Sequence, residues 1–126
     1  MANVTSVKGH FYTTNQELDK DSDAVLEVHK GGKSIGSSST GRSHGKQWTD
    51  GTANDLVVHL TENVSEAQLP SLQFYVRMGA SGNNKWRFKL TLSATLSDGR
   101  TVSSAEKGEV ELNSRGDNWE QATFAW

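Results

Sequence analysis

Three aspartates at alternate positions are the residues of this sequence best suited to binding chemistry. Asp19, Asp21 and Asp23 follow one another at intervals of two, and in an extended chain alternate side chains point to the same side. Carboxylate oxygens are ligands that Ca²⁺ prefers, whereas without a cation the three charges would repel one another and raise their pKa values. The spacing therefore predicts a calcium site. The alternative is a solvated turn in which one aspartate caps the backbone.

This segment differs from the calcium loop of helix–loop–helix proteins. Ala24 and Lys30 stand where that loop has its glycine and its bidentate glutamate. A calcium site here would instead be formed by several loops that meet, and Asp50, from a later loop, is the predicted fourth ligand.

Two tryptophans are candidates for contact with a ligand. Trp48 and Trp119 lie beside polar, turn-forming residues, and an indole offers a broad apolar face that can stack on a sugar ring or enter a membrane interface. The alternative for both is a place in the core. Trp86 and Trp126 alternate in phase with apolar neighbours, so we expect these two rings to be buried.

Catalytic motifs are lacking, and the sequence predicts a protein that is not an enzyme. The four histidines lie on separate segments, and no Gly-x-Ser-x-Gly nucleophile motif is present. Residues 34–45 are rich in glycine and serine. Within them, the string 36–41 lacks the lysine and the following helix of a phosphate-binding loop. We expect this stretch to be a flexible linker between strands.

Composition and charge exclude several further classes of function. The 126 residues suit a single domain over 1–126. The net charge of −2 and the lack of a basic tract argue against nucleic-acid binding. No apolar run is long enough for a transmembrane segment, and no secretory signal is visible at residues 1–8, so we expect a soluble protein, cytoplasmic or released by a non-standard route. The absence of cysteine excludes disulfides and thiolate metal sites.

Alternation of apolar and polar residues dominates the chain and predicts β-strands. It is clearest over residues 86–96, 72–78 and 56–60, and weaker over four more segments, 7–11, 24–28, 110–112 and 122–126. A single helical turn is expected within residues 62–68, with Ser65 as its cap. Gly31-Gly32 and Asp98-Gly99 suit tight hairpins that need positive φ. The pattern predicts an all-β fold, an antiparallel β-sandwich of about 7–8 strands.

Successive connections in such a sandwich fall mostly at opposite ends. The loops around residues 15–23, 45–54, 79–85 and 113–119 should therefore share one end, which we call the acidic end. The polar residues expected there are Asp19, Asp21, Asp23, Asp50, Asn83, Asn84, Asp117 and Asn118. Trp48, Trp86 and Trp119 are expected at the adjoining strand ends.

Four segments of the chain follow the order of a known family. They read TTNQELDKDSDAVLEVHKGGK, WTDGTANDLVVHL, LPSLQFYVRM and SGNNKWRFKLTL. Over most of its length the chain thus resembles the PLAT (lipoxygenase-homology) family and its bacterial relatives. The acidic loop after the first strand is matched by Asp19, Asp21 and Asp23, and the glycine, amide and tryptophan that open a later strand are matched by Gly82, Asn83, Asn84 and Trp86. The long stretch 34–45 departs from the compact members.

The resemblance implies an eight-stranded sandwich that recognises lipid, membrane, carbohydrate or another protein, in some members through calcium. We expect a calcium-assisted, lectin-like carbohydrate-binding module. Its predicted metal ligands are Asp19, Asp21, Asp23 and Asp50, and its predicted ligand-binding residues are Trp48, Asn83, Asn84, Asp117 and Trp119. The alternatives are calcium-dependent binding to a lipid surface and assembly with other proteins in a larger complex.

Overall fold

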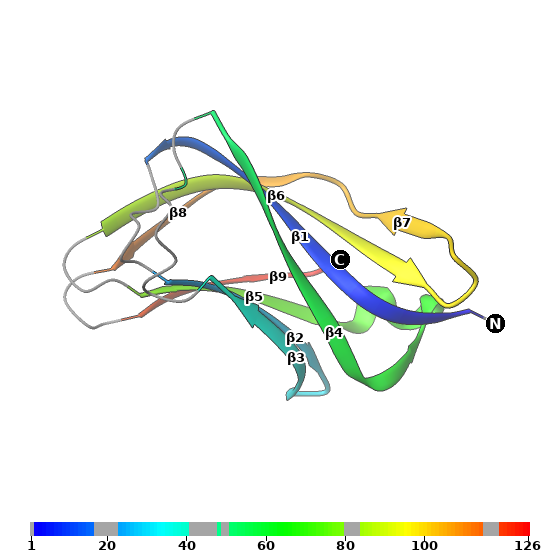
Figure 1. Ribbon diagram of the computed structural model, residues 1–126. Helices are drawn as coiled ribbons and strands as arrows, with labels where there is room; N and C mark the ends of the chain where they lie inside the picture. Colours follow the sequence, from blue (N-terminus) through cyan, green and yellow to red (C-terminus); the bar gives the residue numbers. More distant parts are fainter. Residues whose placement is uncertain (1, 17–22, 41–47, 49–50, 80–83, 115–118) are drawn as a thin grey trace.

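Two antiparallel sheets pack face to face (Figure 1). The computed structural model describes residues 2–16, 23–40, 48, 51–79, 84–114 and 119–126. One sheet has the order β4 (Ala53–Ser65), β1 (Asn3–Gln16), β6 (Asn84–Leu96), and both β7 (Thr101–Ser103) and β8 (Lys107–Ser114) pair with β6. The other has the order β3 (Lys33–Ser39), β2 (Asp23–Lys30), β5 (Gln73–Gly79), β9 (Glu120–Phe124). The predicted antiparallel sandwich is confirmed, with nine strands in the described residues.

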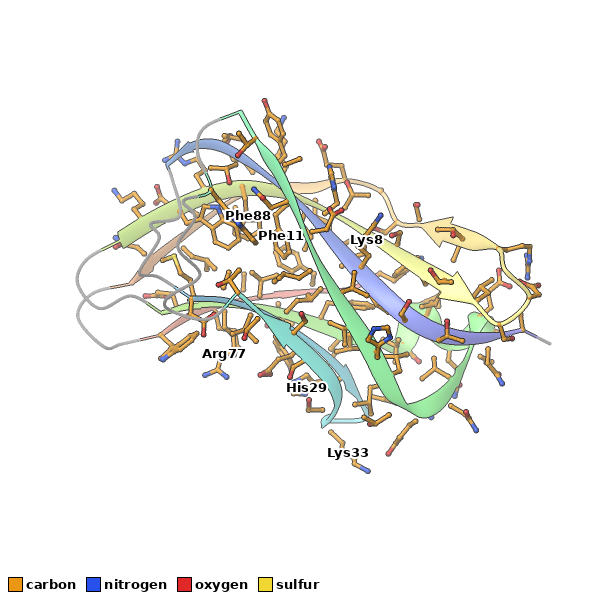
Figure 2. All side chains as sticks on the ribbon, viewed as in Figure 1. Lys8, Phe11, His29, Lys33, Arg77 and Phe88 are labelled. Atoms are coloured by element: carbon orange, nitrogen blue, oxygen red, sulfur yellow. The ribbon has the colours of Figure 1, made fainter. Side chains whose placement is uncertain are left out.

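The alternating pattern places every second residue of the long strands between the sheets. On β6, Trp86, Phe88 and Leu90 are fully buried, while the residues between them face outward. Phe11 of β1 contacts Phe88 edge to face, with ring centroids 5.5 Å apart, and Figure 2 shows both rings between the two sheets. The predicted burial of Trp86 is confirmed. Trp126 is half-buried, and its ring lies 5.9 Å from that of Phe74.

The expectation of a flexible linker at residues 34–45 is wrong for its first half, because Lys33–Ser39 forms strand β3. This strand lies at the sheet edge and pairs with β2, and Ile35 is its one buried apolar residue. Thr61 of β4 donates its hydroxyl to the Ile35 carbonyl at 3.1 Å, and Lys33 pairs with Glu62. Backbone pairing and contacts with β4 hold a segment that has little hydrophobic pattern of its own.

The predicted hairpin turns and the cap at Ser65 are confirmed, but the helical turn lies later than the predicted range 62–68, because residues 62–65 still belong to β4. A short 3₁₀ helix, η1 (Glu66–Ser71), follows Ser65, whose backbone N–H donates to the side-chain oxygen of Gln68 at 2.9 Å. Gly31, Gly32 and Gly99 adopt positive φ in the two hairpins. No helix among the described residues is long and apolar enough to cross a membrane.

Candidate functional site

Strand ends meet at the acidic end as the alternation of connections predicts. Asp23, the first residue of β2, pairs with Gly79, the last residue of β5. The start of β9 pairs beside it, and the start of β6 pairs with the end of β8. The strand ends that adjoin residues 17–22, 80–83 and 115–118 therefore share one end of the sandwich.

Most of the predicted metal ligands and several ligand-binding residues fall outside the described residues. These are Asp19, Asp21, Asp50, Asn83 and Asp117. Asn84 begins β6, but its side chain is likewise not described.

Asp23 is the predicted calcium ligand that can be placed. Its half-buried carboxylate accepts a hydrogen bond from the Thr40 hydroxyl at 3.1 Å, and the same hydroxyl oxygen accepts the Ala24 backbone N–H. Asp23 thus joins the start of β2 to the residue that follows β3. Within the described ranges no group of three or more His, Asp or Glu side chains forms a metal site. The calcium site stays a prediction.

The expected exposure of Trp48 is wrong. Its side chain is only 5% exposed, and its ring lies 5.5 Å from Trp86 and 5.9 Å from Phe11, measured between ring centroids. The aromatic cluster around Phe11 needs a large side chain to fill the end of the core, because the chain is poor in aliphatic residues. Trp48 is therefore a core residue.

Trp119 is exposed, as expected, and lies just before β9. About 37% of its surface is accessible. A Cβ atom at Gly79 would come within 2.5 to 2.8 Å of three atoms of the indole, a distance that real Cβ atoms do not tolerate. Glycine at this position lets the indole lie directly against the end of β5.

Arg77 is the polar neighbour of this indole. Its guanidinium carbon lies 5.3 Å from the centre of the Trp119 ring, within the range of a cation–π contact. Its Nη1 makes a long contact of 3.4 Å with Glu27 on β2. The other carboxylate oxygen of Glu27 lies 3.0 Å from His29 Nε2. Figure 2 shows Arg77 and His29 on the side of their sheet that faces away from Phe11 and Phe88.

An aromatic residue continues this arrangement along β5. The Tyr75 ring meets His29 edge to face, with centroids 4.2 Å apart, and its hydroxyl donates to the Gln73 side chain at 3.2 Å. The outer surface of β2, β5 and β9 thus carries indole, guanidinium, phenol, imidazole and amide groups side by side. We call it the outer face of the second sheet.

Sequence reasoning identified Trp119 and missed its partners. The alternation over residues 72–78 already puts Arg77 and Tyr75 on the outward side of a strand. That they lie beside Trp119 and Glu27 depends on the strand order β2-β5-β9, which joins segments far apart in the chain. Local pattern carries no information on that order.

No family model matches this chain, and no curated protein matches it.

Aromatic faces beside planar polar groups have a definite chemical use. An indole packs against the C–H face of a sugar ring, while guanidinium, amide and carboxylate groups hydrogen bond to hydroxyls in fixed directions. Arg77 lies beside the carboxylate of Glu27, which offsets the charge of the guanidinium. This balance of charges suits a neutral polyhydroxylated ligand better than an anion.

Proposed function

We propose that this protein is a non-catalytic carbohydrate-binding module. The observation that carries the proposal is the pair formed by Trp119 and Arg77, an exposed indole fixed against Gly79 and a guanidinium 5.3 Å from its ring centre. Both groups are held by neighbours that belong to the sheet, so little side-chain entropy is lost when a ligand binds.

The distribution of exposed apolar residues favours a sugar over a membrane surface. Among the described residues the large exposed apolar side chains are Tyr12, Val57 and Trp119. Tyr12 and Val57 lie on β1 and β4, which belong to the five-stranded sheet. Trp119 lies away from them, just before β9 of the four-stranded sheet. A peripheral membrane anchor needs its apolar residues on one face, whereas sugar stacking needs a single ring.

Calcium is part of this proposal. The resemblance to the PLAT family and the acidic segment that ends at Asp23 support loops that bind the ion through carboxylate oxygens. Thermal unfolding with calcium and with a chelator tests this part separately: a Tm raised by calcium and restored by chelation supports it, and an unchanged Tm removes calcium from the proposal.

Binding of the full chain to an array of immobilised glycans tests the main proposal. We expect saturable binding to a saccharide class that Trp119→Ala reduces by about tenfold or more, with little change in Tm. Tyr12→Ala is the matched control, because Tyr12 is an equally exposed aromatic residue on the other sheet. Retention of full binding by Trp119→Ala, or binding only to liposomes, would overturn the proposal.

A further inference from the structure

The outward residues of β5 and β9 form a continuous row that starts at Trp119. Arg77 pairs with Gln121 and Tyr75 pairs with Thr123 across the two strands. Gln73 continues the row beyond Tyr75. Together the row consists of Trp119, Arg77, Gln121, Tyr75, Thr123 and Gln73, all of them exposed or half-buried. We call it the β5–β9 row.

The row is much longer than one sugar ring. Trp119 lies against Gly79. Gln73 lies six positions before Gly79 on β5, which corresponds to about 20 Å at the rise of a β-strand. A ligand that used only the Trp119 end would leave the other polar and aromatic groups without a role in binding.

Contacts from β2 fix the middle of the row. Glu27 lies between His29 and Arg77 and contacts both, one through each carboxylate oxygen. His29 in turn holds the Tyr75 ring edge to face. His29 and Glu27 are themselves largely covered, at 17% and 20% exposure of their side chains, so they act as positioning residues beneath the more exposed Arg77 and Tyr75.

We propose that the β5–β9 row binds an internal segment of a linear, neutral polysaccharide that lies along the two strands. This inference rests on the proposed carbohydrate-binding function and adds the class of ligand and its direction. Successive sugar units would contact first Trp119 and Arg77, then Tyr75 and Thr123, then Gln73. The ligand is an extended chain because the contact groups lie in a line along the sheet.

Isothermal titration with oligosaccharides of increasing length tests the proposal. The probes are cello-, xylo-, malto- and chito-oligosaccharides of one to six units, each titrated into the 126-residue chain. For the series that binds, we expect affinity to rise with length, by about tenfold or more from the disaccharide to the hexasaccharide.

Variants at the two ends of the row separate a long site from a short one. Gln73→Ala and Tyr75→Ala should weaken binding of the hexasaccharide and leave the disaccharide unaffected, while Trp119→Ala weakens both. Gln73 is exposed, so its variant keeps the fold even if Tyr75→Ala does not. If these side chains only stabilise the sheet, the variants would lower Tm without changing the dependence on length.

The failure of this inference is distinguishable from that of the proposed function. A disaccharide that binds as tightly as the hexasaccharide, with Trp119 still required, overturns the extended site and leaves carbohydrate binding intact. Binding confined to branched or terminal sugars on the glycan array overturns it as well. If no saccharide binds in either experiment, both proposals fall together.

Discussion

The indole N–H of Trp86 donates a hydrogen bond to the hydroxyl oxygen of Thr13, 3.1 Å away and fully buried. Thr13 is the one buried polar side chain among the described residues. It lies on β1 and Trp86 on β6, so the bond joins the two central strands of the larger sheet beneath the acidic end. The hydroxyl satisfies a donor that would otherwise be buried without a partner.

Thr13→Val should destabilise the protein by about 1–3 kcal/mol, because the variant keeps the shape of the side chain and leaves the Trp86 N–H without an acceptor. Urea unfolding measures the change in free energy of unfolding. Thr13→Ser is the control, since it retains the hydroxyl and should lose less. Equal losses for the two variants would show that packing, rather than the hydrogen bond, matters at this position.

Trp48→Ala should cost about 3–5 kcal/mol of the free energy of unfolding, as expected for the loss of a large buried aromatic side chain. Its ring contacts Phe11 and Trp86 in the core. Trp119→Ala, at an exposed position, should cost much less. Thermal or urea unfolding of both variants checks the contrast, and the reverse order of stabilities would contradict the placement of the two rings.

Gly79→Ala should weaken saccharide binding without changing any group that contacts the ligand. The new Cβ would lie 2.5 Å from Trp119 Cε2, so the indole has to move away from β5. A double-mutant cycle with Trp119→Ala tests the cause: Gly79→Ala should have little effect on binding once the indole is gone. An equal effect in both backgrounds would mean that Gly79→Ala acts by another route.

Glu62→Gln should lower Tm slightly at neutral pH and leave it unchanged in acid. Lys33 donates a hydrogen bond to the Glu62 carboxylate and holds the pKa of that carboxyl below its usual value of 4.5. A carboxyl whose pKa is lower in the folded state than in the unfolded state stabilises the fold at pH values above its usual pKa. This stabilisation is lost as the pH falls through the lowered pKa of the folded state.

Differential scanning calorimetry at neutral and acidic pH measures this difference. Both side chains are exposed, so added salt should reduce it further. Glu106→Gln is the control, because Glu106 makes no ion pair within the described part of the chain. If Glu62→Gln still lowered Tm at a pH low enough to protonate the Glu62 carboxyl, the explanation would be contradicted.

Much of the fold could be predicted because the strands of the larger sheet have a strict alternation. Residues 86–96 place Trp86, Phe88 and Leu90 on one side, and this side is buried. Strand β3 was not predicted from the sequence, because it is an edge strand rich in serine that is held by backbone pairing with β2. Such pairing leaves no hydrophobic pattern in a polar segment.

The candidate site was predictable in part for the same reason. Counting connections was enough to bring the ends of β2, β5, β6, β8 and β9 together, because antiparallel strands alternate in direction. Trp48 was misplaced, since nothing in its neighbourhood marks a ring that reaches Phe11 across the core. Arg77 was missed because its contact with Trp119 depends on which strands are neighbours.

Strand β1 has a consequence for the order in which the molecule can be assembled. It lies between β4 and β6, and its ladder with β6 joins Val4 to Leu96 and Thr13 to Phe88. A ribosome has to synthesise most of the chain before the second partner of β1 exists. Folding is therefore governed by the closure of long loops, which slows it relative to proteins built from local contacts. Until β6 has been synthesised, the apolar side of β1 must be prevented from packing against other segments.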